Sequence, residues 1–196
     1  MKTIIHTLKI LGTLFYHKRG KSESVELVRS LVTENVLQTE TLHALTSLTE
    51  EQLEHDFSVV FEGMGTMPVP PWGSVYLDKE QVLFGESNTQ YRLFLQQNGI
   101  ELDSGQREPE DQFGLMLLAC AYFLEQGQIQ AACELLGEHL MPWGSTYLEQ
   151  LRDIAPNPFY QRLAVDVSKW LNALIQQQHI EVVKKKIYLD ERIYQY

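Results

Sequence analysis

Apolar side chains recur every three or four positions along most of this chain, which is the spacing of an α-helix. The first such stretch covers residues 3–17, and Gly20 ends it. The same spacing predicts helices at residues 25–32, 42–48, 53–61, 129–140 and 159–178, and another that begins near Ser145. No segment alternates apolar and polar residues strongly enough for a β-strand. We therefore expect an all-α, single-domain helical bundle that spans residues 1–196.

Short sequences of the capping-box type predict where two of the helices begin. Residues 49–52 read Thr-Glu-Glu-Gln and residues 87–90 read Ser-Asn-Thr-Gln. In both, a hydroxyl and an amide three positions apart can satisfy backbone groups at a helix start. We also expect Ser22 or Ser24 to cap the second helix, and Gly99 to end the helix that starts at residue 87.

The most apolar stretch lies in the middle of the chain. Residues 113–124 carry no charge and are apolar on nearly all sides, so a helix here belongs inside a bundle. Pro109 suits its first position, and Gly127 suits the position just past its end. Glu108, Glu110 and Asp111 would then occupy the first helical turn, where a rigid core holds their carboxylates in place.

Helical periodicity stops at residues 62–78, where glycine and proline are frequent. The stretch still contains large apolar side chains, so we expect a long structured loop, which is commonly functional. Its residues 71–77 read Pro-Trp-Gly-Ser-Val-Tyr-Leu, and residues 142–148 repeat this pattern with Thr in place of Val. Coincidence remains open, but we favour two turns of similar local geometry without a shared function.

Composition narrows the classes of partner. Asp and Glu number 26 against 16 Lys and Arg, which gives a net charge of −10. This charge argues against nucleic acid and anionic membranes, and is compatible with a basic peptide. The first residues do not read as a secretion signal, and Cys120 and Cys133 are typical of reduced thiols in a core. We therefore expect a cytoplasmic protein.

Catalytic chemistry is not indicated. The six histidines are scattered without metal-ligand spacing, and there is neither a phosphate-binding glycine loop nor a nucleophile elbow. We expect no enzymatic activity, no cofactor and no metal site.

The acidic segment 101–111 has two interpretations. It holds five acids and one base, Arg107. Acids at a helix start are stabilised by the helix dipole, and this structural explanation accounts for any one of them. Five acids exceed what a helix start requires, and carboxylates accept bidentate hydrogen bonds from arginine, so the segment is also a candidate docking site for guanidinium groups. Trp72 similarly suits either a plug at the end of the bundle or an anchor for a peptide.

Four motifs resemble those of the TorD/DmsD family of redox-enzyme maturation chaperones. They are Pro-Trp-Gly-Ser-Val-Tyr-Leu-Asp at 71–78, Val-Leu-Phe-Gly at 82–85, Glu-Pro-Glu-Asp at 108–111 and Pro-Phe-Tyr at 158–160. The similarity extends from about Phe57 to Gln178. It is weaker in the first helix and in the tail 180–196, which we leave open as docked or flexible.

The resemblance implies an all-helical chaperone that is not an enzyme. Such proteins bind the twin-arginine signal peptide of a molybdoenzyme of the dimethyl sulfoxide reductase type, and delay its export until folding and cofactor insertion are complete. The alternative is a helical adaptor that binds the folded body of the molybdoenzyme or assists cofactor delivery. Transient contact with the Tat translocase is compatible with both, and we expect a monomer, with a domain-swapped dimer left open.

By motif, the resemblance implies a peptide-binding site on the loop and the acidic segment. Its members would be Phe57, Val60, Phe61, Pro71, Trp72, Gly85, Glu108, Pro109, Asp111 and Gln112. The family usually has histidine where Gln112 stands, and an amide cannot titrate, which calls any pH-dependent step of that histidine into question. An aromatic side chain found in relatives is also absent near Gly65. We expect carboxylates to hold the two arginines and Trp72 to contact the apolar stretch that follows them.

Overall fold

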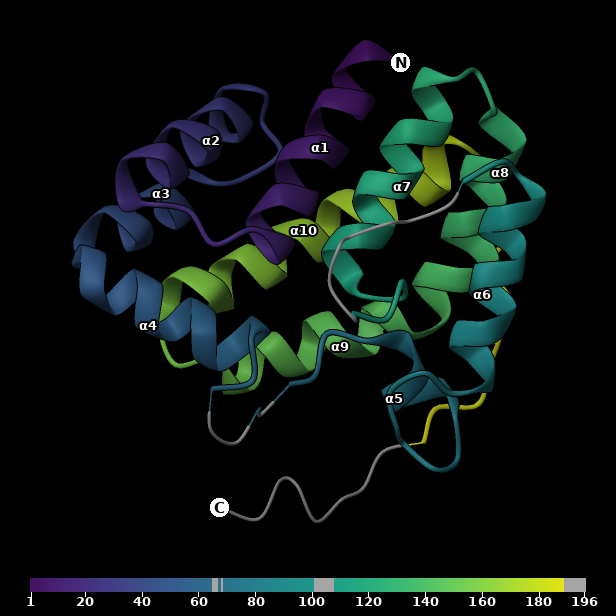
Figure 1. The fold of residues 1–196 in the computed structure, drawn as a ribbon. Coiled ribbons are helices and arrows are strands. Elements are labelled where there is room, and N and C mark those ends of the chain that lie inside the picture. Colours follow the sequence, from purple (N-terminus) through teal and green to yellow (C-terminus); the bar gives the residue numbers. More distant parts are fainter. Residues whose placement is uncertain (65–66, 68, 101–107, 189–196) are drawn as a thin grey trace.

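The computed structural model describes residues 1–64, 67, 69–100 and 108–188, and every element in these ranges is helical. The helices are α1 Lys2–Tyr16, α2 Lys21–Thr33, α3 Thr39–Ser47, α4 Glu50–Phe61, α5 Gly73–Leu77, α6 Glu86–Gln97, α7 Phe113–Glu125, α8 Ile129–Glu134, the π-helix η1 Leu135–Leu140, α9 Met141–Ile154 and α10 Pro158–Gln177. The prediction of an all-α fold is confirmed (Figure 1). Among the described helices, none is long and apolar enough to span a membrane.

Helix α7 lies in the core beside α1 (Figure 1). Phe113, Leu117 and Cys120 are fully buried, and Gly127 follows the helix with a φ of +73°, as the apolar pattern predicted. The two helices approach closely because each has a glycine at the contact. A Cβ added at Gly12 would lie 2.8 Å from the carbonyl oxygen of Gly114, so even a methyl group would not fit without movement.

The predicted start of α7 is wrong by about four residues. The helix begins at Phe113, and Gln112 is its N-cap because the side-chain oxygen accepts a hydrogen bond from the Leu115 N–H. The backbone before it is held outside the helix, since the Phe113 N–H donates to the Pro71 carbonyl at 2.8 Å. Glu108, Glu110 and Asp111 therefore precede the helix instead of forming its first turn.

The capping predictions have mixed outcomes. The box at Thr49 is confirmed, with both reciprocal hydrogen bonds present at the start of α4. The other two are wrong, because the N-caps of α2 and α6 are Gly20 and Gly85, and neither makes a side-chain cap. Ser87 lies in the first turn of α6, where its N–H and hydroxyl donate to Asp78 instead.

The two similar motifs pack against each other. Trp72 is the N-cap residue of α5, whereas Trp143 lies inside α9, which begins at Met141, earlier than predicted. The Trp143 ring stacks on Tyr76 with 5.4 Å between centroids, and a Cβ on Gly73 would lie 2.8 Å from its Nε1. The motifs therefore contribute two surfaces to one contact.

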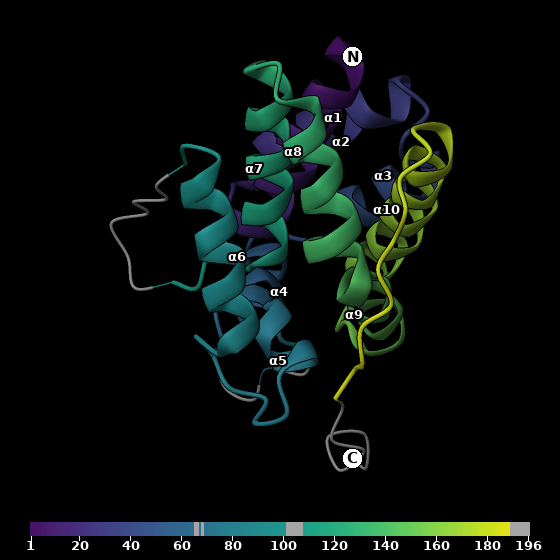
Figure 2. The ribbon, with the colours of Figure 1, turned by 90° about the vertical axis from the view of Figure 1, so that its right-hand side faces the viewer.

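The C-terminal segment 180–188, here called the strap, is docked on the bundle. It leaves α10, crosses η1 and ends beside α5 (Figure 2). Ile180, Val182 and Ile187 pack against the core as partly buried side chains. The rest of the predicted tail, 189–196, lies outside the described residues, as do the acidic loop 101–106, Arg107 and Gly65.

Candidate functional site

The loop motif and the acidic motif meet at an isolated antiparallel bridge between Trp72 and Gln112. The Gly73 N–H donates to the Asp111 carbonyl at 3.1 Å, and the Phe113 N–H donates to the Pro71 carbonyl. Two segments almost forty positions apart in the sequence are thus joined backbone to backbone. Trp72 and the acidic motif 108–111, which the sequence singled out, therefore lie on adjacent segments of the chain.

Asp111 is 3% exposed and links three segments of the fold. One carboxylate oxygen accepts from the Ser74 N–H at 2.5 Å, in the first turn of α5, and the other accepts from the side-chain amide of Asn88 in α6 at 3.0 Å. Burial raises the pKa of the Asp111 carboxyl to about 6, while the hydrogen bonds from Ser74 and Asn88 oppose the rise. Its contacts in this conformation are internal, and direct contact with a ligand stays a prediction.

Glu108 is the acid of the motif that lies between the interior and the surface. The hydroxyl of Tyr16, at the end of α1, lies near this carboxylate and lowers its pKa. The Trp72 indole N–H faces the same carboxylate and favours its charged form, although this N–H does not reach hydrogen-bond geometry. Burial is the main cause that raises the pKa of Glu108, and the nearby charge of Glu62 raises it further. A cation bound here would stabilise the charged carboxylate against both its burial and the repulsion from Glu62.

Glu110 already has protein partners. It forms an ion pair with Arg92 of α6 at 3.0 Å, and its side chain is 15% exposed. The side-chain amide of Asn88 also donates to it at 3.3 Å. The acids therefore occupy different environments: Asp111 and Glu110 bind α5 and α6, and Glu108 lies beside Trp72 and Tyr16.

Gln112 is a buried residue that holds the backbone of the site in place. Its side-chain oxygen caps α7, and its amide nitrogen donates to the Phe15 carbonyl at 2.9 Å. The residue is 1% exposed. In this position it uses the two ends of the amide for two structural hydrogen bonds, and ties the start of α7 to the end of α1.

The remaining predicted members are mostly buried. Phe57, Val60 and Phe61 on α4 are at most 5% exposed and belong to the core, and Phe61 lies edge-on to Phe15 with 5.7 Å between ring centroids. Pro71 and Pro109 are buried as well. Gly85 caps α6 so close to Asp78 that a Cβ would fall 2.0 Å from its carboxylate oxygen. These residues shape and support the site, and their role in binding stays a prediction.

Sequence reasoning missed Tyr16, Glu62 and Asn88 as parts of this neighbourhood. Tyr16 ends α1 and Glu62 is the C-cap of α4, so each reads locally as an ordinary helix terminus. Asn88 falls inside the supposed capping box at residue 87, which drew attention to the wrong partner. Asn88 is identified by its hydrogen bonds to Glu110 and Asp111, and Tyr16 and Glu62 by their effect on the pKa of Glu108.

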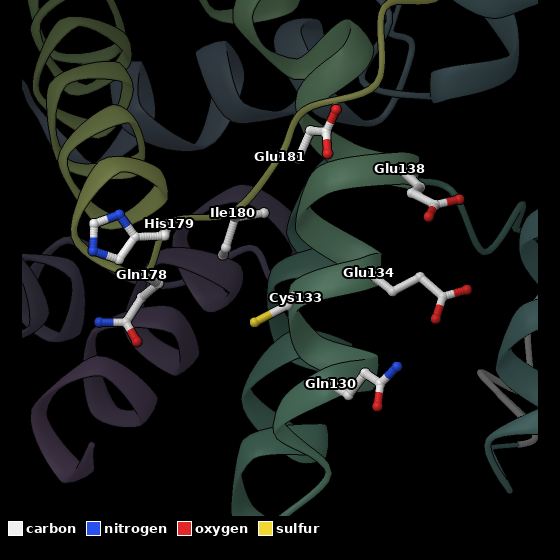
Figure 3. Close-up of a pocket in the computed structure, with 8 residues that line it drawn as sticks. All are labelled: Gln130, Cys133, Glu134, Glu138, Gln178, His179, Ile180 and Glu181. Carbon is white, nitrogen blue, oxygen red and sulfur yellow. The ribbon is translucent and has the colours of Figure 1, made fainter.

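A separate groove of about 270 Å³ lies between α8, η1 and the strap, and Figure 3 shows its lining. It carries Glu134, Glu138, Glu181, Cys133 and His179, all of them at least partly exposed. Figure 2 places α8 and α5 at opposite ends of the molecule, so this groove is not part of the site around Trp72. In the part of the chain that the structure describes, no three His, Cys, Asp or Glu side chains gather as metal ligands.

Comparisons with known proteins agree on one family. The family described as "Nitrate reductase delta subunit" matches residues 29–149. A protein of Salmonella paratyphi A named "Tat proofreading chaperone DmsD" is 37% identical over 182 residues, which cover 86% of this chain and 89% of the relative. A probable protein of the same name from Haemophilus influenzae is 35% identical, over 92% of this chain and 94% of the relative.

The fold has a known counterpart in a solved structure. A crystal structure of a proposed redox enzyme maturation protein from Archaeoglobus fulgidus superposes with a TM-score of 0.63. It covers 86% of this chain and 93% of the other, with 15% sequence identity. At that identity the likeness shows the fold alone.

Proposed function

The chain belongs to the TorD/DmsD family of redox-enzyme maturation chaperones, and from this we propose that it binds the twin-arginine signal peptide of a molybdoenzyme. The client would be of the dimethyl sulfoxide reductase type. Binding delays export until the enzyme has folded and received its cofactor. The protein acts in the cytoplasm without catalysing a reaction, and its contact with the Tat translocase is transient.

The placement of Glu108 beside Trp72 supports this proposal most directly. A partly buried carboxylate that lies near the Tyr16 hydroxyl and near a second negative charge at Glu62 favours a cation. A guanidinium group fits a carboxylate through two parallel hydrogen bonds. The apolar stretch that follows the arginines in such a leader would then contact the indole of Trp72.

Asp111 has a different part in the proposal. Its carboxylate holds the first turn of α5 and the side chain of Asn88, so it fixes the position of Trp72 relative to Glu108. We propose Glu108 as the main contact for one arginine. Asp111 and Gln112 act as the buried supports that keep this contact in place.

The free leader is disordered, so part of the interaction energy is spent on ordering it, about 2–5 kcal/mol. We expect a dissociation constant near 1 μM, which corresponds to roughly −8 kcal/mol. The net charge of −10 speeds the encounter with a cationic peptide at low salt. Such an affinity allows a chaperone to release its client.

Calorimetry with a twin-arginine leader tests the proposal. Replacing the Arg-Arg pair with Lys-Lys should weaken binding clearly, because lysine cannot form the bidentate contact. Glu108→Gln should weaken binding of the Arg-Arg leader more than binding of the Lys-Lys leader. Glu40→Gln, an exposed acid on α3, is the matched control because it changes the net charge equally. Equal affinity for both leaders would reject the guanidinium site.

A second candidate is an adaptor that also binds the folded body of the enzyme, and an exposed apolar turn favours it. Val82, Leu83 and Phe84 are consecutive and 51%, 43% and 51% exposed. Contiguous apolar surface of this kind often marks a protein interface. A pull-down with an enzyme that lacks its leader distinguishes the two candidates: capture that Phe84→Ser abolishes favours the adaptor, and no capture favours the leader alone.

A further inference from the structure

The strap joins the far side of the bundle to the short helix that presents Trp72. Its Val183 N–H donates to the Gly137 carbonyl of η1 at 3.0 Å. At its other end the Tyr188 N–H donates to the Tyr76 carbonyl of α5 at 2.7 Å, and the Gln81 side chain donates to the Tyr188 carbonyl at 2.7 Å. Figure 2 shows this segment running along the molecule toward α5.

The local structure of η1 creates the seat for the strap. In a π-helix a carbonyl pairs with the N–H five positions later, and for Gly137 that position is Pro142, which has no N–H. The Val183 N–H of the strap supplies a donor there. Gly137 also leaves room for the strap backbone, because a Cβ would lie 2.4 Å from the Glu181 carbonyl oxygen. Figure 3 shows Ile180 and Glu181 where the strap meets this helix.

The other end of the strap meets an element that cannot hold its place alone. Helix α5 has five residues, far fewer than a helix needs for independent stability. Its first turn is held by Asp111 and its face by the stacking of Tyr76 on Trp143. The Tyr188 N–H of the strap donates a hydrogen bond to the Tyr76 carbonyl in the last turn of this helix.

We propose that the strap positions α5 for leader binding, so that its docking on Gly137 and Tyr76 is coupled to the affinity for the signal peptide. This rests on the proposed function, since it concerns the same site. Trp72 directly precedes α5, and a shift of that helix moves the indole relative to Glu108. Coupling between two such events is reciprocal: if strap docking strengthens leader binding, leader binding must strengthen strap docking by the same factor.

Gly137→Ala tests the proposal in the full-length chain. Alanine favours a helix, so η1 keeps its local preference while the added methyl overlaps the strap backbone. We expect faster amide hydrogen exchange over 180–188 and a dissociation constant for the twin-arginine leader raised about fivefold, the scale of one lost hydrogen bond. In the wild type, saturating leader should slow exchange over 180–188, a response that a merely structural strap would not show.

Matched variants separate the outcomes. Ser22→Ala, at an exposed position on α2, should change neither the exchange nor the affinity. Gln81→Ala removes the side-chain hydrogen bond to the Tyr188 carbonyl and should also lower the affinity for the leader. This variant keeps the test available even if Gly137→Ala does not fold.

The proposal would be overturned by a freed strap with unchanged leader affinity, or by strap exchange that does not respond to the leader. A Gly137→Ala chain whose strap stays as protected as the wild type would also contradict it. A wild type that does not distinguish Arg-Arg from Lys-Lys would instead refute the proposed function itself. If the wild type does distinguish the two leaders, and the Gly137→Ala variant binds the leader as tightly as the wild type, only the proposed role of the strap is refuted.

Discussion

Asp111→Asn should change how the stability of this protein depends on pH. The Asp111 carboxyl is 3% exposed, and burial raises its pKa from 3.8 to about 6. Asparagine has the same shape and cannot ionise. Its amide oxygen can still accept from the Ser74 N–H, and Asn88 can turn its own amide to match at the cost of its 3.3 Å hydrogen bond to Glu110, so the variant should fold.

The sign follows from the direction of the shift. A raised pKa means that folding favours the protonated acid, so this contribution is fully present below about pH 3.8 and is lost as the pH rises through about 6. The whole difference amounts to roughly 3 kcal/mol. Between about pH 4.5 and pH 7.5 the wild type should lose roughly 2 kcal/mol of unfolding free energy relative to Asp111→Asn.

Urea unfolding followed by circular dichroism at several pH values measures this difference. Other titrating groups, such as His139, are common to both chains and cancel. Asp153→Asn is the control, because Asp153 is exposed and the Arg152 hydrogen bond lowers its pKa, which gives the opposite sign. Parallel pH profiles for wild type and Asp111→Asn would show that the desolvation of this carboxylate has been misjudged.

Two further substitutions test how the site is supported. Gly12→Ala should destabilise the fold by about 1–3 kcal/mol, because its methyl would meet Leu118 at 2.6 Å and the Gly114 carbonyl at 2.8 Å; an unchanged urea midpoint would contradict the close helix contact. Gln112→Ala should cost about 1–2 kcal/mol in thermal or urea unfolding, since it removes the N-cap of α7 and leaves the Phe15 carbonyl without its donor; a loss well below this would mean that water replaces both bonds.

Short-range signals accounted for much of the helical layout. The spacing of apolar residues placed α1, α4 and the buried body of α7, and the Thr49 box and Gly127 marked helix ends correctly. Those features depend on neighbours within one or two turns, which the sequence contains. The starts of α2 and α6 were misplaced, because glycine can begin a helix without a side-chain cap and a nearby serine then attracts the prediction.

The candidate site could be predicted only as a set of residue types. The motifs pointed to Trp72, Glu108 and Asp111, and their adjacency was a hypothesis until the bridge between Trp72 and Gln112 was seen. The different environments of the acids were not foreseen, since solvation depends on what covers each carboxylate. Asp111 is buried and accepts hydrogen bonds from α5 and α6, whereas Glu108 is partly buried near Tyr16 and Trp72.

By itself, the sequence determined the class of fold, the most apolar helix and the family motifs, because each of these is written in residues close together in the chain. The tertiary structure alone decided that Gly12 meets Gly114, that the strap seats on Gly137, and that the carboxylate of Asp111 serves the fold while that of Glu108 lies beside Trp72. Such contacts join segments far apart in sequence, and their energies depend on burial and distance, which no local pattern specifies.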